Sequence, residues 1–298
     1  MKEFKSRAAG FIFLLVVYAA AAGIGVAVYR VLNGSALLRL LLADVAATVF
    51  IFLVSVIVKN PSVYDPYWSV APVVILALLI PARSGWQTGN VLLFICVAYW
   101  GIRLTANWAY TFRGLGVCDW RYEMLAQRSG AWFPLVSLFG IMLFPTIVVF
   151  LCLLPAMDYL ESGGVNALTC SGFAVCLLAT TLQLVSDMQL HRFQRTAPGR
   201  GMIIRTGLWK YARHPNYLGE ILMWWGICLV MLSVRPAHWF LCAGALVNTL
   251  MFLFISIPMA EKRLAGYKEG FPAYRSETNM LLPLPLLRAG KSRGLYEA

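Results

Sequence analysis

The residues best suited to chemistry gather between positions 187 and 220 of a chain that is otherwise apolar. Six of the 25 Lys and Arg residues lie between Arg192 and Arg213. The planar guanidinium group of arginine can donate paired hydrogen bonds to a phosphate, and helix ends supply further polar groups. This concentration of donors predicts a pocket for a large anion at a membrane surface. The alternative is that the charge marks only membrane topology and contacts with lipid headgroups.

Acidic and amide residues in the same segment favour a functional pocket. Asn216 and Glu220 lie one helical turn apart, and Asp187 lies on a polar face of the preceding helix. Such groups are costly near the membrane interior and tend to be functional there. The polar face recurs at helical spacing and consists of Gln183, Asp187, His191 and Gln194.

Two breaks separate these helices. Residues 198–201, with the sequence PGRG, end the first helix, and residues 206–208 form a second turn. Pro215 suits the first turn of the following helix, where its missing N–H costs nothing. The segment therefore connects two apolar helices through a basic loop.

The composition is that of an integral membrane protein, with 60% hydrophobic and 13% charged residues and a mean hydropathy of +0.72. The third and seventh of eight candidate spans are short enough to be tilted, broken or re-entrant. We predict an all-α polytopic helical bundle with about 7–8 transmembrane helices. The candidate spans are residues 11–32, 36–58, 66–82, 89–112, 131–156, 165–188, 217–234 and 237–258.

The net charge of +12 is explained by topology. Placing the N-terminus in the cytoplasm puts 21 of the 25 basic residues on that side, which predicts cytoplasmic N- and C-termini. Short outer loops fit a bacterial inner membrane, and nucleic-acid binding is not expected. The seven Cys and three His lack metal-ligand spacing, so no metal site is expected. The basic residues left on the other side are Arg30, Arg39, Arg83 and Arg235.

A second candidate group lies in the N-terminal half, where Asp65 precedes Pro66, Tyr67 and Trp68. An acid held against aromatic walls can keep a proton and act as a hydrogen-bond donor. The alternative is that Asp65 caps the third helix, with Pro66 at its first position.

The end of the fourth span carries another polar face, which together with that of Asp187 predicts a shared cavity. The alternative is that Arg103 extends its charged end to the membrane surface while the aromatic residues form an interfacial belt. The face consists of Tyr99, Arg103, Asn107 and Tyr110, and a polar loop with Arg113, Asp119, Trp120, Arg121, Tyr122 and Arg128 follows it.

The run TGLWKYARHPNYLGEILMWWG, with Asp187 upstream and IPMAEKRLAGYKEGFPAYRSET downstream, resembles the C-terminal region of the steroid 5-alpha-reductase family, in particular its bacterial branch. The wider superfamily also holds sterol C14 reductases and isoprenylcysteine carboxyl methyltransferases, which share an R-H-P-x-Y-x-G run. The resemblance implies a helical membrane core that takes up NADPH from the cytosol. We accordingly expect N-terminal transmembrane helices over residues 1–58. A reductase-like membrane domain would follow over 59–298, with its cofactor loop at 187–220 and a cytoplasmic tail from about Glu261, in which Pro283 to Pro285 indicate an irregular end that lies on the surface.

The resemblance also implies roles for single residues. Asp187, Asn216 and Glu220 would contact the polar parts of the nicotinamide cofactor, and Arg113 would contact a phosphate. The family's arginine and histidine in the last helix have no counterpart here, and Glu261 and Arg263 are the candidates to replace them. The surplus of arginine favours NADPH over NADH, because arginine suits a 2′-phosphate. The predicted cofactor-binding residues are Arg113, Asp187, Arg192, Arg205, Tyr211, Arg213, His214, Asn216, Tyr217, Glu220 and Glu261.

The predicted catalytic residues are Asp65 and Tyr99. Asp65 stands seven residues before Pro72, similar to the family's substrate-side glutamate, and Tyr99 resembles its tyrosine partner. Aspartate is shorter than the family's glutamate, so its carboxyl group reaches less far toward the substrate. This implies reduction of a carbon–carbon double bond conjugated to a carbonyl in a lipophilic substrate, which is steroid-like, polyprenyl or fatty. Membrane lipids and this substrate are the expected partners.

Two other functions remain open from the residues. An S-adenosylmethionine-dependent membrane methyltransferase is supported by the RHPNYLG run and by Glu261, whereas Asn216 and Glu220 favour the reductase. In a non-catalytic membrane protein the same polar faces would only pack helices together.

Overall fold

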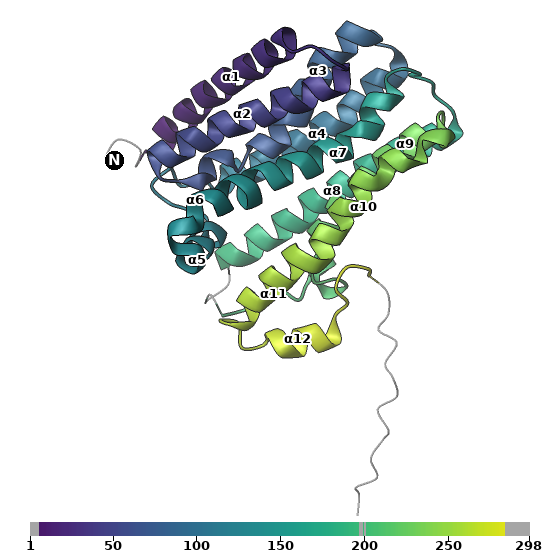
Figure 1. Cartoon of the computed structure of the whole chain (residues 1–298). Helices are drawn as coiled ribbons and strands as arrows, with labels where there is room; N and C mark the ends of the chain where they lie inside the picture. The colour runs from purple at the N-terminus through teal and green to yellow at the C-terminus, as the bar shows by residue number, and fades with distance from the viewer. Residues whose placement is uncertain (1–5, 197–198, 200, 284–298) are drawn as a thin grey trace, which may run out of the picture. The chain divides into compact units, whose positions relative to one another are not determined.

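The structure is a computed structural model, and it describes residues 6–196, 199 and 201–283 (Figure 1). The described residues are helical and form no β-strand beyond one isolated parallel bridge between Ala212 and Asn279. The helices are α1 (Arg7–Val31), α2 (Ala36–Val58), α3 (Tyr67–Arg83), α4 (Thr88–Thr111), α5 (Trp120–Ser129), α6 (Phe133–Leu135), α7 (Phe144–Tyr159), α8 (Ala167–Thr196), α9 (Pro215–Leu232), α10 (Ala243–Met251), α11 (Ile257–Ala265) and α12 (Phe271–Glu277).

Eight helical segments in the described part are long and apolar enough to cross a membrane, which confirms the predicted all-α polytopic bundle. Each of the eight predicted spans overlaps one of them. The fifth segment begins at Trp120 rather than at residue 131, because the polar helix α5 leads into it. The segments are Arg7–Val31, Ala36–Val58, Pro61–Arg83, Thr88–Thr111, Trp120–Tyr159, Ala167–Thr196, Pro215–Leu232 and Pro236–Ala265.

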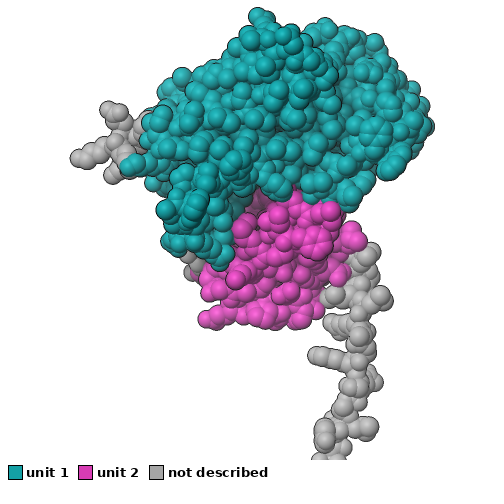
Figure 2. Space-filling view, viewed as in Figure 1, with its two compact units in different colours: residues 1–177, 223–248 teal, residues 178–222, 249–298 magenta. Residues whose placement is uncertain are grey.

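The chain divides into two compact units, which Figure 2 colours separately. Unit 1 comprises residues 1–177 and 223–248, and unit 2 comprises residues 178–222 and 249–298. Helices α8 and α9 each have one end in either unit. The predicted organisation into residues 1–58 and 59–298 stays a prediction.

In unit 1, α1 packs against α2, and α3 packs against α4 and α7. A Cβ added at Gly101 of α4 would lie 2.5 Å from the carbonyl oxygen of Ser69, so glycine permits the close approach of α3 and α4. Apolar residues and tyrosines form the core between the N-terminal helices. Its most deeply buried members are Ala21, Ile51, Val63, Tyr64 and Met142.

The turn between α2 and α3 sets the place of Asp65. Lys59 ends α2 in the left-handed conformation with φ 56°, and the side chain of Asn60 accepts a hydrogen bond from the Ser62 amide at the start of a short 3₁₀ helix, Pro61–Tyr64. The N-cap of α3 is Pro66, which offers no side-chain cap. The alternative that Asp65 caps α3 is therefore wrong, because Pro66 takes that position.

Unit 2 holds the predicted cofactor segment, residues 187–220, and the C-terminal helices α11 and α12. A Cβ at Gly219 of α9 would lie 2.5 Å from the carbonyl oxygen of Ala179 on α8, so these helices touch through backbone. Pro215 begins α9 as predicted, and Gly207 forms the predicted turn with φ +59°.

The tail predicted from about Glu261 begins with helical structure in the described residues. Glu261 belongs to α11, and α12 follows with Phe271 and Tyr274 buried. Two aromatic residues at helical spacing give α12 a face to bury. Residues 284 and 285 of the predicted tail, and residues 198 and 200 of the predicted helix break, lie outside the described residues.

Candidate functional site

The segment that leads into α9 is held against the chain after α12. The Arg213 amide donates to the Asn279 carbonyl at 2.8 Å, and the His214 amide donates to the Met280 carbonyl at 3.1 Å. From α12, the Tyr274 hydroxyl donates to the Trp209 carbonyl at 2.5 Å. These bonds fix the backbone of two predicted cofactor-binding residues, Arg213 and His214.

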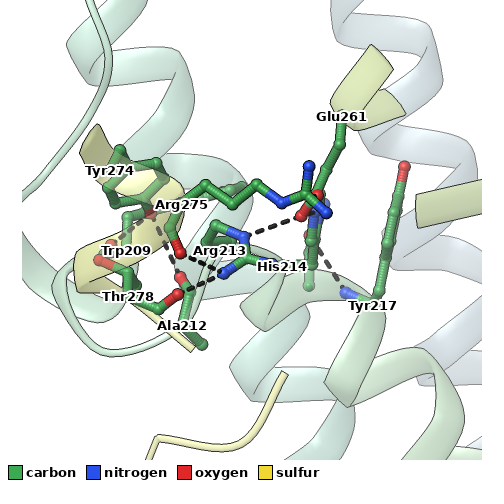
Figure 3. A network of polar contacts seen from close by, with 10 residues as sticks. Trp209, Ala212, Arg213, His214, Tyr217, Glu261, Tyr274, Arg275 and Thr278 are labelled. Atoms are coloured by element: carbon green, nitrogen blue, oxygen red, sulfur yellow. Dashed lines mark hydrogen bonds and ion pairs between the residues drawn. The ribbon is translucent and has the colours of Figure 1, made fainter. Parts of the chain in front are cut away.

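Both of these side chains reach one buried carboxylate (Figure 3). Arg213 Nε lies 2.8 Å and His214 Nε2 lies 3.1 Å from the same oxygen, Oε1 of Glu261. All three side chains are less than a tenth exposed. A buried ion pair needs hydrogen bonds to its remaining groups, and Arg213 Nη1 supplies them by donating to the carbonyls of Arg275 and Thr278.

The other oxygen of this carboxylate faces a second cation. Arg275 Nε lies 3.4 Å from Oε2 of Glu261, with the arginine side chain largely exposed. Two guanidinium groups and one carboxylate leave the cluster with a positive charge even when His214 is neutral. The arrangement therefore attracts anions.

A stack of rings extends from this cluster. The rings of His214 and Tyr217 are stacked with centroids 5.2 Å apart and planes at 5°. The ring of Tyr217 in turn contacts the ring of Phe252, with their centroids 4.9 Å apart. Flat aromatic surfaces of this kind can pack against the planar ring of a ligand.

The predicted acid and amide of α8 and α9 also meet. Asn216 Nδ2 donates to Oδ1 of Asp187 at 3.2 Å, and Glu220 lies buried one turn further along α9. On α8, Gln183 is completely buried, yet both its amide nitrogen and its amide oxygen lack a hydrogen-bond partner within the described residues. Leaving such groups unmatched is expensive, so this face of α8 fits a ligand with its own donor and acceptor.

The remaining predicted cofactor-binding residues lie at the surface. Arg205 Nη1 forms an ion pair with Glu277 at 2.8 Å, and Arg205 Nη2 donates to the Gly270 carbonyl at 3.1 Å. The exposed residues are Arg113 after α4, Arg192 near the end of α8, and Arg205 and Tyr211 in the loop before α9. The structure thus brings Arg213, His214 and Glu261 together and pairs Asp187 with Asn216, while it leaves these four on exposed surface.

The two predicted catalytic residues belong to unit 1. Oδ1 of Asp65 accepts a hydrogen bond of 2.5 Å from the hydroxyl of Tyr122 on α5. Tyr99 lies half-buried on α4. The phenol bonded to Asp65 is thus Tyr122, and the pairing of Asp65 with Tyr99 stays a prediction.

The loop before α5 is tied to the turn that carries Asp65. Asn60 Nδ2 donates to the Leu115 carbonyl at 2.7 Å, and the Asp119 amide donates to the Ser62 hydroxyl at 3.1 Å. Asp119 then caps α5 by accepting from the Arg121 amide. Burial raises the pKa of the Cys118 thiol in this loop to about 11, so the thiol is protonated near neutral pH.

Two site residues escaped the sequence analysis in these roles, and a buried acid of α2 escaped it altogether. Tyr122 was only one member of a polar loop, and Gln183 only one member of a polar face. Asp44 was overlooked, although a carboxyl group inside an apolar helix is itself a signal of function.

The chain belongs to the family described as protein of unknown function DUF1295, which it matches over residues 51–278. It is 26% identical over 199 residues to the uncharacterized protein C594.04c of Schizosaccharomyces pombe, which covers 57% of this chain and 57% of the relative. It is also 27% identical over 116 residues to the 3-oxo-5-alpha-steroid 4-dehydrogenase 1 of Rattus norvegicus, covering 39% of this chain and 41% of that protein.

The corresponding protein of Mus musculus is again 27% identical, over 39% of this chain and 42% of the relative. The chain thus spans about half the length of the curated relatives it matches. No solved structure matches it significantly. The similarity to two steroid dehydrogenases confirms the resemblance to the steroid 5-alpha-reductase superfamily at a distant level.

Proposed function

We propose that this protein is a membrane-embedded, NADPH-dependent reductase of a carbon–carbon double bond conjugated to a carbonyl in a lipophilic substrate. The observation that carries the proposal is the positively charged cluster of Arg213, His214, Glu261 and Arg275, because an anion-attracting cluster lies among residues predicted to bind the cofactor. Distant similarity to the 3-oxo-5-alpha-steroid 4-dehydrogenases supports the reaction class.

The residues of unit 2 would hold the cofactor by matched chemistry. A primary amide offers both a donor and an acceptor, so the unmatched Gln183 amide suits the carboxamide of nicotinamide. Asp187 and Asn216 would orient the same end, and the exposed guanidinium groups of Arg192 and Arg205 would contact phosphates. When bound, NADPH supplies the hydride that reduction needs.

The residues of unit 1 would act on the substrate carbonyl. Hydrogen bonds donated by the protonated carboxyl group of Asp65 and by the Tyr99 hydroxyl to the carbonyl oxygen would stabilise the negative charge that develops there during reduction. The hydroxyl of Tyr122, 2.5 Å from Asp65 Oδ1, would hold this carboxyl in place. Tyr122 is thus a positioning residue in this scheme.

The distribution of basic residues supports cytoplasmic N- and C-termini, and the short outer loops fit a bacterial inner membrane. A membrane-impermeant maleimide applied to intact cells would test this topology with single cysteines introduced at Lys210 and Trp239 of a variant that lacks the seven native cysteines. We expect labelling at position 239 alone, and labelling at position 210 would reverse the orientation.

Ligand binding to the purified full chain tests the cofactor. A ligand that binds only the folded state raises thermal stability by mass action, so the protein is heated with NADPH, NADH or S-adenosylmethionine. We expect stabilisation by NADPH that is lost in Asp187→Ala and Glu220→Ala and reduced in the milder Asp187→Asn. Glu161→Gln, which alters an exposed ion pair with Arg235 outside the predicted cofactor-binding set, is the control that keeps the response.

Turnover of a panel of lipophilic enones then tests the reaction. Asp65→Asn and Tyr99→Phe should each lower turnover at least about tenfold while NADPH still stabilises the protein. Wild-type rates in both variants would contradict the assignment of Asp65 and Tyr99 as catalytic residues. Stabilisation by S-adenosylmethionine instead would favour a methyltransferase, and no response to any ligand would favour a non-catalytic protein.

A further inference from the structure

A pocket within unit 1 lies between α2, α3 and α7 and has a carboxyl group in its wall. The free space inside it takes about one water-sized group, whereas sites that enclose a whole small molecule measure roughly 300–1,000 Å³. The pocket therefore has room for a single small polar group at the end of a larger molecule. Its apolar lining includes Trp68, Ala71 and Ile75 of α3 and Val149, Phe150 and Leu153 of α7.

The polar part of the wall is an acid–phenol pair. The hydroxyl of Tyr67 donates to Oδ1 of Asp44 at 2.6 Å, and the carboxyl residue is only 8% exposed. Asp44 lies within α2, in one of the segments apolar enough to cross a membrane. A carboxyl group in such a place is costly unless its hydrogen-bonding capacity is used.

The neighbouring hydroxyl groups do not use that capacity, because they bond one another. Thr146 Oγ1 lies 3.0 Å from Thr48 Oγ1 and 2.8 Å from the Tyr64 hydroxyl. Within the described residues, the Asp44 side chain accepts one hydrogen bond, and its donor is the Tyr67 hydroxyl. A carboxyl group offers about four lone-pair sites, so most of the capacity of Asp44 remains available to a molecule in the pocket.

A hydroxyl group is the ligand chemistry that suits this position. An alcohol can donate to an ionised carboxylate, and it can accept from a protonated carboxyl group. A carbonyl oxygen satisfies the protonated form alone, and an ammonium ion satisfies the ionised form alone. The apolar walls require that the rest of the molecule be a hydrocarbon body.

We propose that the pocket lined by Asp44 and Tyr67 binds the hydroxyl end of a lipid alcohol taken from the membrane. The carboxyl group of Asp44 anchors the hydroxyl, and the apolar side chains of Trp68, Phe150 and Leu153 lie beside the adjoining hydrocarbon. The site lies wholly within unit 1, and it depends on neither NADPH nor the reductase reaction.

Photolabelling of the purified full chain in detergent tests the site without any cofactor. The probe is a long-chain primary alcohol with a diazirine in its chain, and the corresponding unlabelled alcohol, alkane and amine compete with it. We expect labelled peptides from α3 or α7, and about tenfold better competition by the alcohol than by the alkane, because a hydroxyl-binding site rejects an analogue that lacks the group.

A double variant removes the anchor without leaving an unpaired group. In Asp44→Leu with Tyr67→Phe both polar partners become apolar, a change that folded proteins tolerate better than loss of one partner. The advantage of the alcohol should disappear while labelling by an alkane diazirine persists. The matched control, Thr169→Val with Ser233→Ala, removes a hydroxyl pair at 2.6 Å that does not line the pocket, and should keep the advantage.

Several results would overturn the proposal. Equal competition by alcohol and alkane in the wild-type protein would exclude a hydroxyl anchor, even if the double variant does not fold. Retention of the advantage in a folded double variant would exclude Asp44 and Tyr67 as that anchor. Stronger competition by the amine would make this a cation site, and labelling confined to other helices would place the ligand elsewhere.

Discussion

Arg213 Nε lies 2.8 Å from Oε1 of Glu261, so two residues 48 positions apart form an ion pair that is less than a tenth exposed. The pair joins the segment just before α9 to α11 within unit 2. Removing one partner of a buried pair leaves an uncompensated charge, which costs roughly 3–5 kcal/mol. We therefore expect Glu261→Ala to lower the free energy of unfolding by about this amount, measured by thermal melting of the detergent-purified protein.

The matched control is an exposed ion pair of the same unit. Arg205 and Glu277 have side chains that are 43% and 59% exposed, and such a pair contributes about 0–1 kcal/mol. Glu277→Ala should thus melt close to the wild-type temperature. Equal melting temperatures for Glu261→Ala and Glu277→Ala would show that the Glu261 carboxylate does not stabilise the fold by compensating the buried charge of Arg213.

The buried phenol of Tyr274 makes the stability of unit 2 sensitive to alkali. Burial raises its pKa from the ordinary value of 10.0 to about 12. Below pH 10 the phenol is protonated in folded and unfolded chains alike, so its full contribution is present. Between pH 10 and about 12 the unfolded chain releases a proton that the folded chain keeps, so stability falls as the pH rises.

The variant Tyr274→Phe isolates this contribution from that of the other tyrosines. At neutral pH it should be about 1–3 kcal/mol less stable than the wild type, because the Trp209 carbonyl loses its buried donor. Its melting temperature should then fall less steeply than that of the wild type as the pH is raised through this window. Parallel curves for the two proteins would exclude Tyr274 as the responsible group.

The helical spans were predictable because hydropathy is a local property. Each predicted span overlaps a helix of the described structure. Helix α9 begins at Pro215, as predicted from the missing N–H of proline. The polar face of α8 was predictable for the same reason, since helical spacing alone places Gln183 and Asp187 together.

The partners across the chain were not predictable from local pattern. Nothing near Glu261 indicates that Arg213, rather than another of the loop arginines, is its partner, because the pairing depends on how α11 and the start of α9 are packed. The bond between Asp65 and Tyr122 likewise depends on the fold of the loop that ends at Asp119. The family resemblance supplied Tyr99 as a partner by analogy, without information on that loop.

The close contact of α8 and α9 predicts that position 219 admits no side chain. A Cβ there would lie 2.5 Å from the Ala179 carbonyl oxygen and 2.5 Å from Cγ of Gln183. Gly219→Val should therefore destabilise the protein by at least about 1–3 kcal/mol, because backbone must move to make room. Gly23→Ala in α1, where an added Cβ meets nothing within 4 Å, is the control and should melt at or above the wild-type temperature. A wild-type melting temperature for Gly219→Val would refute the backbone contact.

The exposed arginine near the end of α8 predicts how the two nicotinamide cofactors are distinguished under the proposed function. Arg192 has an exposed side chain in the predicted cofactor loop, and a guanidinium suits the 2′-phosphate that NADPH carries and NADH lacks. We expect Arg192→Gln to weaken NADPH binding about tenfold, which corresponds to about 1.4 kcal/mol, and to leave NADH binding unchanged. Calorimetric titration of the purified protein measures both affinities. Arg128→Gln, at an exposed arginine of α5 outside the predicted cofactor-binding set, is the control. An equal loss of affinity for both cofactors in Arg192→Gln would show that Arg192 contacts a part of the molecule that NADPH and NADH share.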